Sequence, residues 1–162
     1  MITERKLEAA CMQTLEHELP GCWVWKINSM TQGGLPDLEV AWRGHTTKIE
    51  FKLLKKAETV QTKWEDQRQL FTLKRYQEQT ERAWVVAYRC ASKKHGREDD
   101  DTLLYKPSAL LNDALPEPDE GVTTYVLNHP ARLSERLWTL GVVRLPGFNH
   151  QAVVELVRQT HV

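Results

Sequence analysis

Apolar residues in the first part of the chain recur with a helical period. They stand four positions apart over 3–19, which predicts an amphipathic helix that ends at Pro20-Gly21. The apolar positions of this helix are Leu7, Cys11, Leu15 and Leu19. One helical face is therefore expected to pack against the rest of the protein.

Short apolar or alternating segments follow, and these predict strands. The predicted strands span 22–28, 37–42, 46–54 and 83–90. The short connection Arg43-Gly44-His45 predicts a hairpin between the second and third strands, and a helix from about Lys63 to Gln79 precedes the fourth. The order α-β-β-β-α-β, followed by a mixed appendage, indicates an α/β fold in which helices flank a mixed sheet.

Beyond residue 100 the pattern predicts shorter elements. We expect strands at 102–106 and 122–128, a short helix over 107–115, and helices near 130–140 and 149–160. A chain of 162 residues is most simply one domain with its own core. Most of the six tryptophans are expected in that core, and Trp64 is the one most open to a role in base stacking.

Composition places the protein among ordinary globular proteins. No apolar run approaches the ~20 residues of a membrane span, and the N-terminal segment MITERKLEAAC has no signal-peptide core. The three cysteines, at 11, 22 and 90, form no close pair, which argues against a zinc knuckle and against a disulfide framework. We expect a cytoplasmic protein without membrane association, or a virion-associated one if a phage encodes it.

The formal net charge of +0 conceals an uneven distribution of charge. Residues 43–94 hold 13 Lys and Arg against 6 Asp and Glu, whereas residues 95–120 hold 2 against 8. A basic segment suits a phosphate backbone, whose neutralisation dominates sequence-independent binding of nucleic acid. A solvated helix face of mixed charge is the alternative.

One group of residues indicates a particular chemistry. Asp37 opens a predicted strand, and Glu50 and Lys52 stand two apart on the next one, so they share a face while Phe51 points to the core. Two carboxylates can hold a hard divalent cation, and an amine can orient or deprotonate the attacking water. This set suits a magnesium-dependent phosphodiesterase, and a cross-strand salt bridge at a sheet edge is the alternative.

Other hydrolase and nucleotide-binding motifs are absent from the sequence. It contains no H-E-x-x-H helix, no G-x-x-x-x-G-K-[ST] loop and no G-x-S-x-G elbow. The segment GGLPD precedes a strand rather than a helix, so it does not fit a dinucleotide fingerprint. A zinc hydrolase of that type, a P-loop ATPase and a dinucleotide-dependent enzyme are not expected.

GGLPD at 33–37, IEFK at 49–52 and a long helix with a glutamine follow one another in order. This arrangement resembles the PD-(D/E)xK nuclease superfamily, and within it the VRR-NUC and Holliday-junction-resolvase-like nucleases. The resemblance covers 3–90. It implies a restriction-endonuclease-like mixed central sheet flanked by helices, within a single domain over 1–162 that carries a C-terminal α+β extension over 100–162.

The resemblance also implies roles for individual residues. Asp37 and Glu50 would bind the metal, Phe51 would add its backbone carbonyl, and Lys52 would organise the nucleophile. The first helix of many family members adds an acid, for which Glu8 fits best.

Several of these assignments leave alternatives open. Glu4, one turn before Glu8, is the second choice for the helix acid. The catalytic glutamine after the lysine would be Gln67, with Gln61 as the alternative. Glu39 ranks below Glu8 as a further acid.

We therefore expect a DNA endonuclease or exonuclease that depends on Mg²⁺ or Mn²⁺, with a preference for DNA structure left open. Backbone contacts are expected from Lys26, Lys55, Lys56, Lys63, Arg68, Lys74 and Arg75. The alternative is a nucleic-acid-binding or assembly component of a phage particle or repair complex that retains a nuclease fold. Residues 100–162 would then be the place where a second copy or another partner docks.

Overall fold

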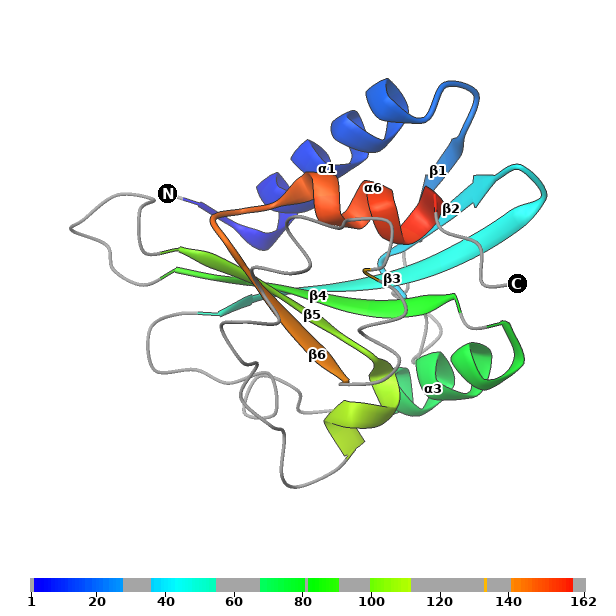
Figure 1. Cartoon of the computed structure of the whole chain (residues 1–162), viewed down its shortest axis with the longest axis vertical. Coiled ribbons are helices and arrows are strands. Elements are labelled where there is room, and N and C mark those ends of the chain that lie inside the picture. Colours follow the sequence, from blue (N-terminus) through cyan, green and yellow to red (C-terminus); the bar gives the residue numbers. More distant parts are fainter. Residues whose placement is uncertain are drawn as a thin grey trace.

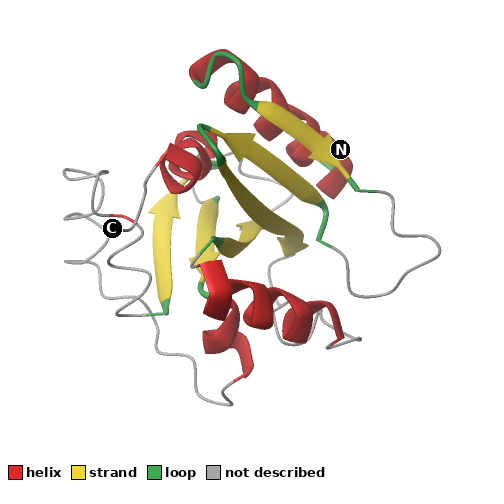
Figure 2. Cartoon of the chain, turned by 90° about the vertical axis from the view of Figure 1, so that its right-hand side faces the viewer, coloured by secondary structure: helices red, strands yellow, loops and turns green. Residues whose placement is uncertain are grey.

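The computed structural model describes residues 2–27, 36–54, 68–80, 82–90, 100–111, 133 and 141–158. Within these residues, one six-stranded mixed sheet is covered by helices on both faces (Figures 1 and 2). The predicted α/β fold with a mixed sheet is therefore confirmed at this level. No helix in the described ranges is both long and apolar enough to cross a membrane.

The strands stand in the sheet in the order in which they occur in the chain. They are β1 (Trp23–Lys26), β2 (Leu38–Trp42), β3 (His45–Leu54), β4 (Ala83–Arg89), β5 (Asp101–Tyr105) and β6 (Val142–Pro146). Strands β3 and β4 are parallel, and every other neighbouring pair is antiparallel. A parallel pair needs a crossover, and helix α3 (Arg68–Thr80) lies in the segment that makes it.

Each face of the sheet has its own apolar core. Helices α1 (Glu4–Glu18) and α6 (His150–Arg158) lie on one face, and α3 and the 3₁₀ helix η1 (Pro107–Leu111) lie on the other (Figure 1). Phe51 packs in the core under α1 and α6, whereas Val85, the β4 partner of Glu50, packs in the core with α3. Glu50 therefore lies on the α3 face of β3.

Helix α1 forms where the apolar spacing predicts it. The hydroxyl of Thr3 accepts a hydrogen bond from the Lys6 N–H at 3.3 Å, which caps the first turn. Its buried side chains include Leu7, Cys11 and Leu15. The chain then leaves the helix through Gly21, whose φ of 80° suits a glycine.

The hairpin between β2 and β3 fixes the register of the candidate site. Arg43 and Gly44 have φ of 47° and 80°, and two consecutive positive φ values are typical of the two-residue turn that matches strand twist. Trp42 pairs with His45, and the register then runs back to the pair Leu38 and Ile49.

The C-terminal part of the chain differs in detail from the expectation. β6 was not predicted, because Val142 and Val143 are covered on opposite faces and the segment has no alternating pattern. The helix expected over 107–115 is a 3₁₀ helix over Pro107–Leu111. The segments expected at 122–128 and, apart from helical Leu133, at 130–140 lie outside the described residues.

The described residues beyond 100 nevertheless belong to the same sheet and core. β5 pairs with β4, β6 pairs with β5, and α6 packs beside α1. Tyr88 of β4 joins the two parts, since its ring contacts Phe51 and Phe148 and its hydroxyl lies 2.8 Å from His150 Nδ1. Among the described residues, this region therefore extends the fold of the first ninety.

Candidate metal centre

The candidate site lies where β2 separates from β3. Pairing between the two strands ends at Leu38 and Ile49, but β3 continues beside β4 as far as Leu54. The N–H and C=O groups of one strand residue point to the same edge. Phe51 and Leu53 therefore direct their backbone groups toward an edge that β2 has left, where these groups need other partners.

Carboxylates take the place of the missing strand. The Phe51 N–H donates to Asp37 Oδ2 at 2.8 Å, and the Leu53 N–H donates to Glu4 Oε2 at 2.9 Å. The Asp37 N–H in turn donates to Glu50 Oε2 at 3.2 Å. Acidic side chains from α1, from the start of β2 and from β3 thus meet at one strand edge.

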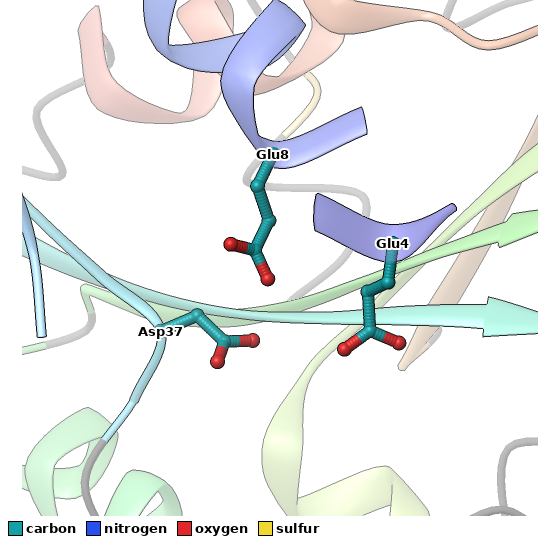
Figure 3. Close-up of side chains that lie close together, drawn as sticks. All are labelled: Glu4, Glu8 and Asp37. Atoms are coloured by element: carbon teal, nitrogen blue, oxygen red, sulfur yellow. The ribbon is translucent and has the colours of Figure 1, made fainter. Parts of the chain in front are cut away.

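Helix α1 supplies two acids, one turn apart. Carboxylate oxygens of Glu4, Glu8 and Asp37 lie within 4.8 Å of one another (Figure 3). Glu8 is only 5% exposed. Its Oε2 lies 3.0 Å from Lys26 Nζ, and the two groups form an ion pair.

Gathering carboxylates in a half-buried place is costly unless positive charge offsets them, and Lys26 pairs with only one of these three acids. The three neighbouring acids fit a hard cation, which prefers carboxylate and carbonyl oxygen. The donor set is therefore suited to Mg²⁺ or Mn²⁺ and contains no thiol or imidazole that would favour zinc.

Glu50 and Lys52 point to the same face, as strand alternation predicts. Glu50 is 2% exposed, and its Oε1 accepts a hydrogen bond from Lys52 Nζ at 2.9 Å. Phe51, between them, points to the other face and stacks on Tyr88 with ring centroids 6.0 Å apart. Its carbonyl lies on the same strand edge as its N–H, beside Asp37.

Crowding and burial shift the protonation of these groups. Burial, reinforced by the charge of Asp37, raises the pKa of Glu50 to about 8. Burial also raises the pKa of Asp37 to about 6, although the hydrogen bond from Phe51 opposes the shift. Burial alone would lower the pKa of Lys52, but Glu50 and the other nearby acids outweigh it and raise that pKa.

The charges at the site do not balance among the described residues. The carboxylates of Glu4, Glu8, Asp37 and Glu50 lie together with the ammonium groups of Lys26 and Lys52. Four acids against two bases leave two negative charges when all are ionised. A divalent cation would offset this excess.

Most of the expected site residues that the structure describes lie in the cluster, one reaches it from β1, and one lies outside it. Asp37, Glu50, Phe51, Lys52 and Glu8 lie together, and Glu4 joins them rather than replacing Glu8. Lys26 reaches the cluster, where it pairs with Glu8. Glu39 instead pairs with Lys48.

The remaining expected residues either lie outside the described residues or lie on α3. Lys55, Lys56, Lys63, Gln67, the alternative Gln61 and Trp64 lie outside the described residues. On α3, Lys74 pairs with Glu78 at 3.3 Å, and Arg68 and Arg75 are exposed.

Two features were not foreseen from the sequence. One is the hydrogen bond from Leu53 to Glu4, for which the only signal was the spacing of four between Glu4 and Glu8. The other is the exposure of both Trp23 and Trp25, since most of the tryptophans were expected in the core, as Trp84 is. Comparisons of the chain with family models, with curated proteins and with solved structures found no match.

Proposed function

We propose that the protein is a divalent-metal-dependent nuclease that hydrolyses phosphodiester bonds in DNA, of the PD-(D/E)xK type. The observation that carries the proposal is the convergence of Glu8, Asp37 and Glu50 at the open edge of β3, beside the ammonium group of Lys52. A simple salt bridge at a sheet edge would not need four carboxylates beside two ammonium groups.

The residues that would hold Mg²⁺ or Mn²⁺ are Asp37, Glu8 and Glu50, together with the carbonyl of Phe51. Glu4 lies close enough to contribute through its second oxygen. When bound, the metal would supply a polarised water and would stabilise negative charge on the phosphoryl oxygens. The raised pKa values of Asp37 and Glu50 make their affinity for a cation dependent on pH, since the proton and the cation compete for them.

Lys52 supplies positive charge at the place where a phosphate would approach. Its pKa is raised, so it is an ammonium group at neutral pH and acts as a donor rather than as a base. It can hold the attacking water, or a phosphate oxygen, by a charge-assisted hydrogen bond. Glu50, which accepts from Lys52, orients that ammonium group.

DNA is the substrate class that the charge distribution favours. The segment 43–94, which contains β3, α3 and β4, is basic, with 13 Lys and Arg against 6 Asp and Glu. Such a basic segment suits a polyanion better than a small phosphodiester. Basic residues of this segment would then hold the backbone beside the acidic centre.

A cleavage assay tests this function. Wild-type protein, Asp37→Asn and Lys52→Met are incubated with supercoiled, linear and branched DNA, in Mg²⁺, Mn²⁺ or EDTA. We expect cleavage that requires the metal and that falls at least 100-fold in either variant, in line with the loss of a charge-stabilising group.

Glu39→Gln is the matched control, because Glu39 is an acid on β2 that pairs with Lys48 outside the cluster. It should cleave like the wild type. If wild-type protein leaves every substrate intact but still binds DNA, the nuclease assignment is wrong and a binding or assembly role replaces it.

A further inference from the structure

Strand β1 exposes two indole side chains. Trp23 is 67% exposed and Trp25 is 58% exposed, and among the described residues Phe71 is the only other large apolar side chain that is exposed. Single exposed apolar residues are common on protein surfaces. Two exposed tryptophans on one face of an edge strand are less common, because leaving indole in water is costly. Such a pair indicates a binding surface.

The two indoles lie on the α3 face of the sheet, to which Glu50 and Lys52 of the candidate centre also point. Val24 packs against the core under α1, and Lys26 reaches Glu8 of α1. Because strand side chains alternate, Trp23 and Trp25 point to the opposite face. That is also the α3 face, on which the side chain of Glu50 lies.

The register places these residues within reach of one nucleic-acid strand. Trp25 pairs with Glu39 of β2, two residues from Asp37. Strand geometry then puts Trp25 about 8 Å and Trp23 about 14 Å from Asp37, measured between backbones. These spans correspond to roughly two and four nucleotides of a stacked strand.

The spacing of the two indoles also suits bases. Residues two apart on a strand lie about 7 Å from each other, which is about twice the 3.4 Å between stacked nucleotides in one strand. One base fits between the rings, or each ring receives one base.

We propose that Trp23 and Trp25 form a stacking platform for unpaired bases of the nucleic acid whose backbone reaches the candidate metal centre. This rests on the proposed function, and it narrows the substrate to DNA that has a single-stranded segment next to the cut. Bases of an intact duplex stack on one another and do not offer a face to an indole. A platform of this kind is tolerant of base sequence.

The test measures binding apart from cleavage. All proteins carry Asp37→Asn, so that the proposed cleavage is switched off, and Mg²⁺ is present. Fluorescence anisotropy compares a labelled single-stranded oligothymidine with a duplex of the same length. Tryptophan fluorescence, which a stacked base quenches, is the second readout.

We expect Trp25→Ala to weaken single-strand binding by about 5- to 150-fold, the range for the loss of one stacked base, and to change duplex binding less than twofold. Trp25→Phe, which keeps a ring, should recover most of the affinity. Phe71→Ala removes an exposed ring from α3 and serves as the control that should leave single-strand binding unchanged. Circular dichroism confirms that each variant is folded.

Several outcomes would overturn the platform. One is equal weakening of single-strand and duplex binding, and another is unchanged single-strand binding in the Trp23→Ala, Trp25→Ala double variant. A change from dimer to monomer in that double variant, without a change in DNA affinity, would assign the indoles to contact between two copies of the chain. The assay measures binding and needs no cleavage. Its result can therefore be interpreted even if the protein proves not to be a nuclease.

Discussion

Glu4 offers a sharp test of how the open edge of β3 is held. Its Oε2 accepts the hydrogen bond of the Leu53 N–H at 2.9 Å, and Leu53 lies in a strand that β2 no longer covers. Glu4 also adds a negative charge beside Glu8 and Asp37. Two substitutions separate these effects, because Glu4→Gln removes the charge and keeps an acceptor, whereas Glu4→Ala removes both.

The difference between the two variants measures the hydrogen bond. A bond to a charged acceptor contributes about 1.5–3 kcal/mol and one to a neutral acceptor about 0.5–1.5 kcal/mol. Glu4 is half-buried, so water replaces part of the lost acceptor. We expect Glu4→Ala to be less stable than Glu4→Gln by about 1 kcal/mol, and Glu4→Gln to be at least as stable as the wild type without metal, because it relieves repulsion between carboxylates.

Urea denaturation in EDTA at neutral pH gives the free energies of unfolding. Amide hydrogen exchange adds a local readout: the Leu53 amide should lose protection in Glu4→Ala and keep it in Glu4→Gln, while Phe51, whose acceptor is Asp37, stays protected in both. Glu78 on α3 is the control site. There the Ala variant should be as stable as the Gln variant, or more stable by a few tenths of a kcal/mol, because alanine has the higher helix propensity. If Glu4→Ala matches Glu4→Gln in both stability and Leu53 protection, the carboxylate does not hold this edge.

Two further predictions concern the charge of the cluster. Because the pKa of Glu50 is raised to about 8, the folded metal-free protein keeps a proton that the unfolded chain releases near pH 4.5, so stability should fall by a few kcal/mol as the pH rises from about 4.5 to 8. Urea titrations in EDTA should show that Glu50→Gln removes the larger part of this fall in stability and Glu39→Gln none of it. Equal pH profiles for the wild type and both variants would contradict the assignment of the pH dependence to Glu50. Second, millimolar Mg²⁺ at pH 8 should raise the Tm of the wild type but not of Asp37→Asn; at 100 times Kd the gain is about 2.7 kcal/mol, or roughly 5–10 °C for a chain of this size. KCl at equal ionic strength is the control, and equal shifts in both proteins would mean that Mg²⁺ acts elsewhere.

The sequence was most informative where the structure is set by neighbouring residues. Alternation along β3 is enough to place Glu50 and Lys52 on one face and Phe51 in the core, because the period of a strand is local. The turn at Arg43 and Gly44 likewise fixes the hairpin register and brings Asp37 beside Glu50. This part of the site could be predicted without knowledge of the tertiary structure.

Features that depend on distant contacts could not be predicted in this way. The sequence left open whether Glu4 or Glu8 joins the cluster, since that depends on how α1 packs over β3. Hydrophobicity alone favoured the core for most tryptophans, but Trp23 and Trp25 lie on β1, an edge strand on which both are exposed. In each case the sequence does not tell which helix covers which face of the sheet.

The open edge of β3 links the stability of this fold to its proposed chemistry. Backbone N–H groups at the edge of a sheet must find acceptors, and here acidic side chains provide them in place of a further strand. A carboxylate that accepts one hydrogen bond retains lone pairs for another partner, so Asp37 and Glu4 can support β3 and face a cation together. The arrangement gathers more negative charge than the nearby lysines offset, which destabilises the metal-free protein and strengthens its attraction for a divalent cation. Substitutions that relieve the repulsion should therefore stabilise the metal-free fold and weaken metal binding at once, a trade-off that a purely structural salt bridge would not produce.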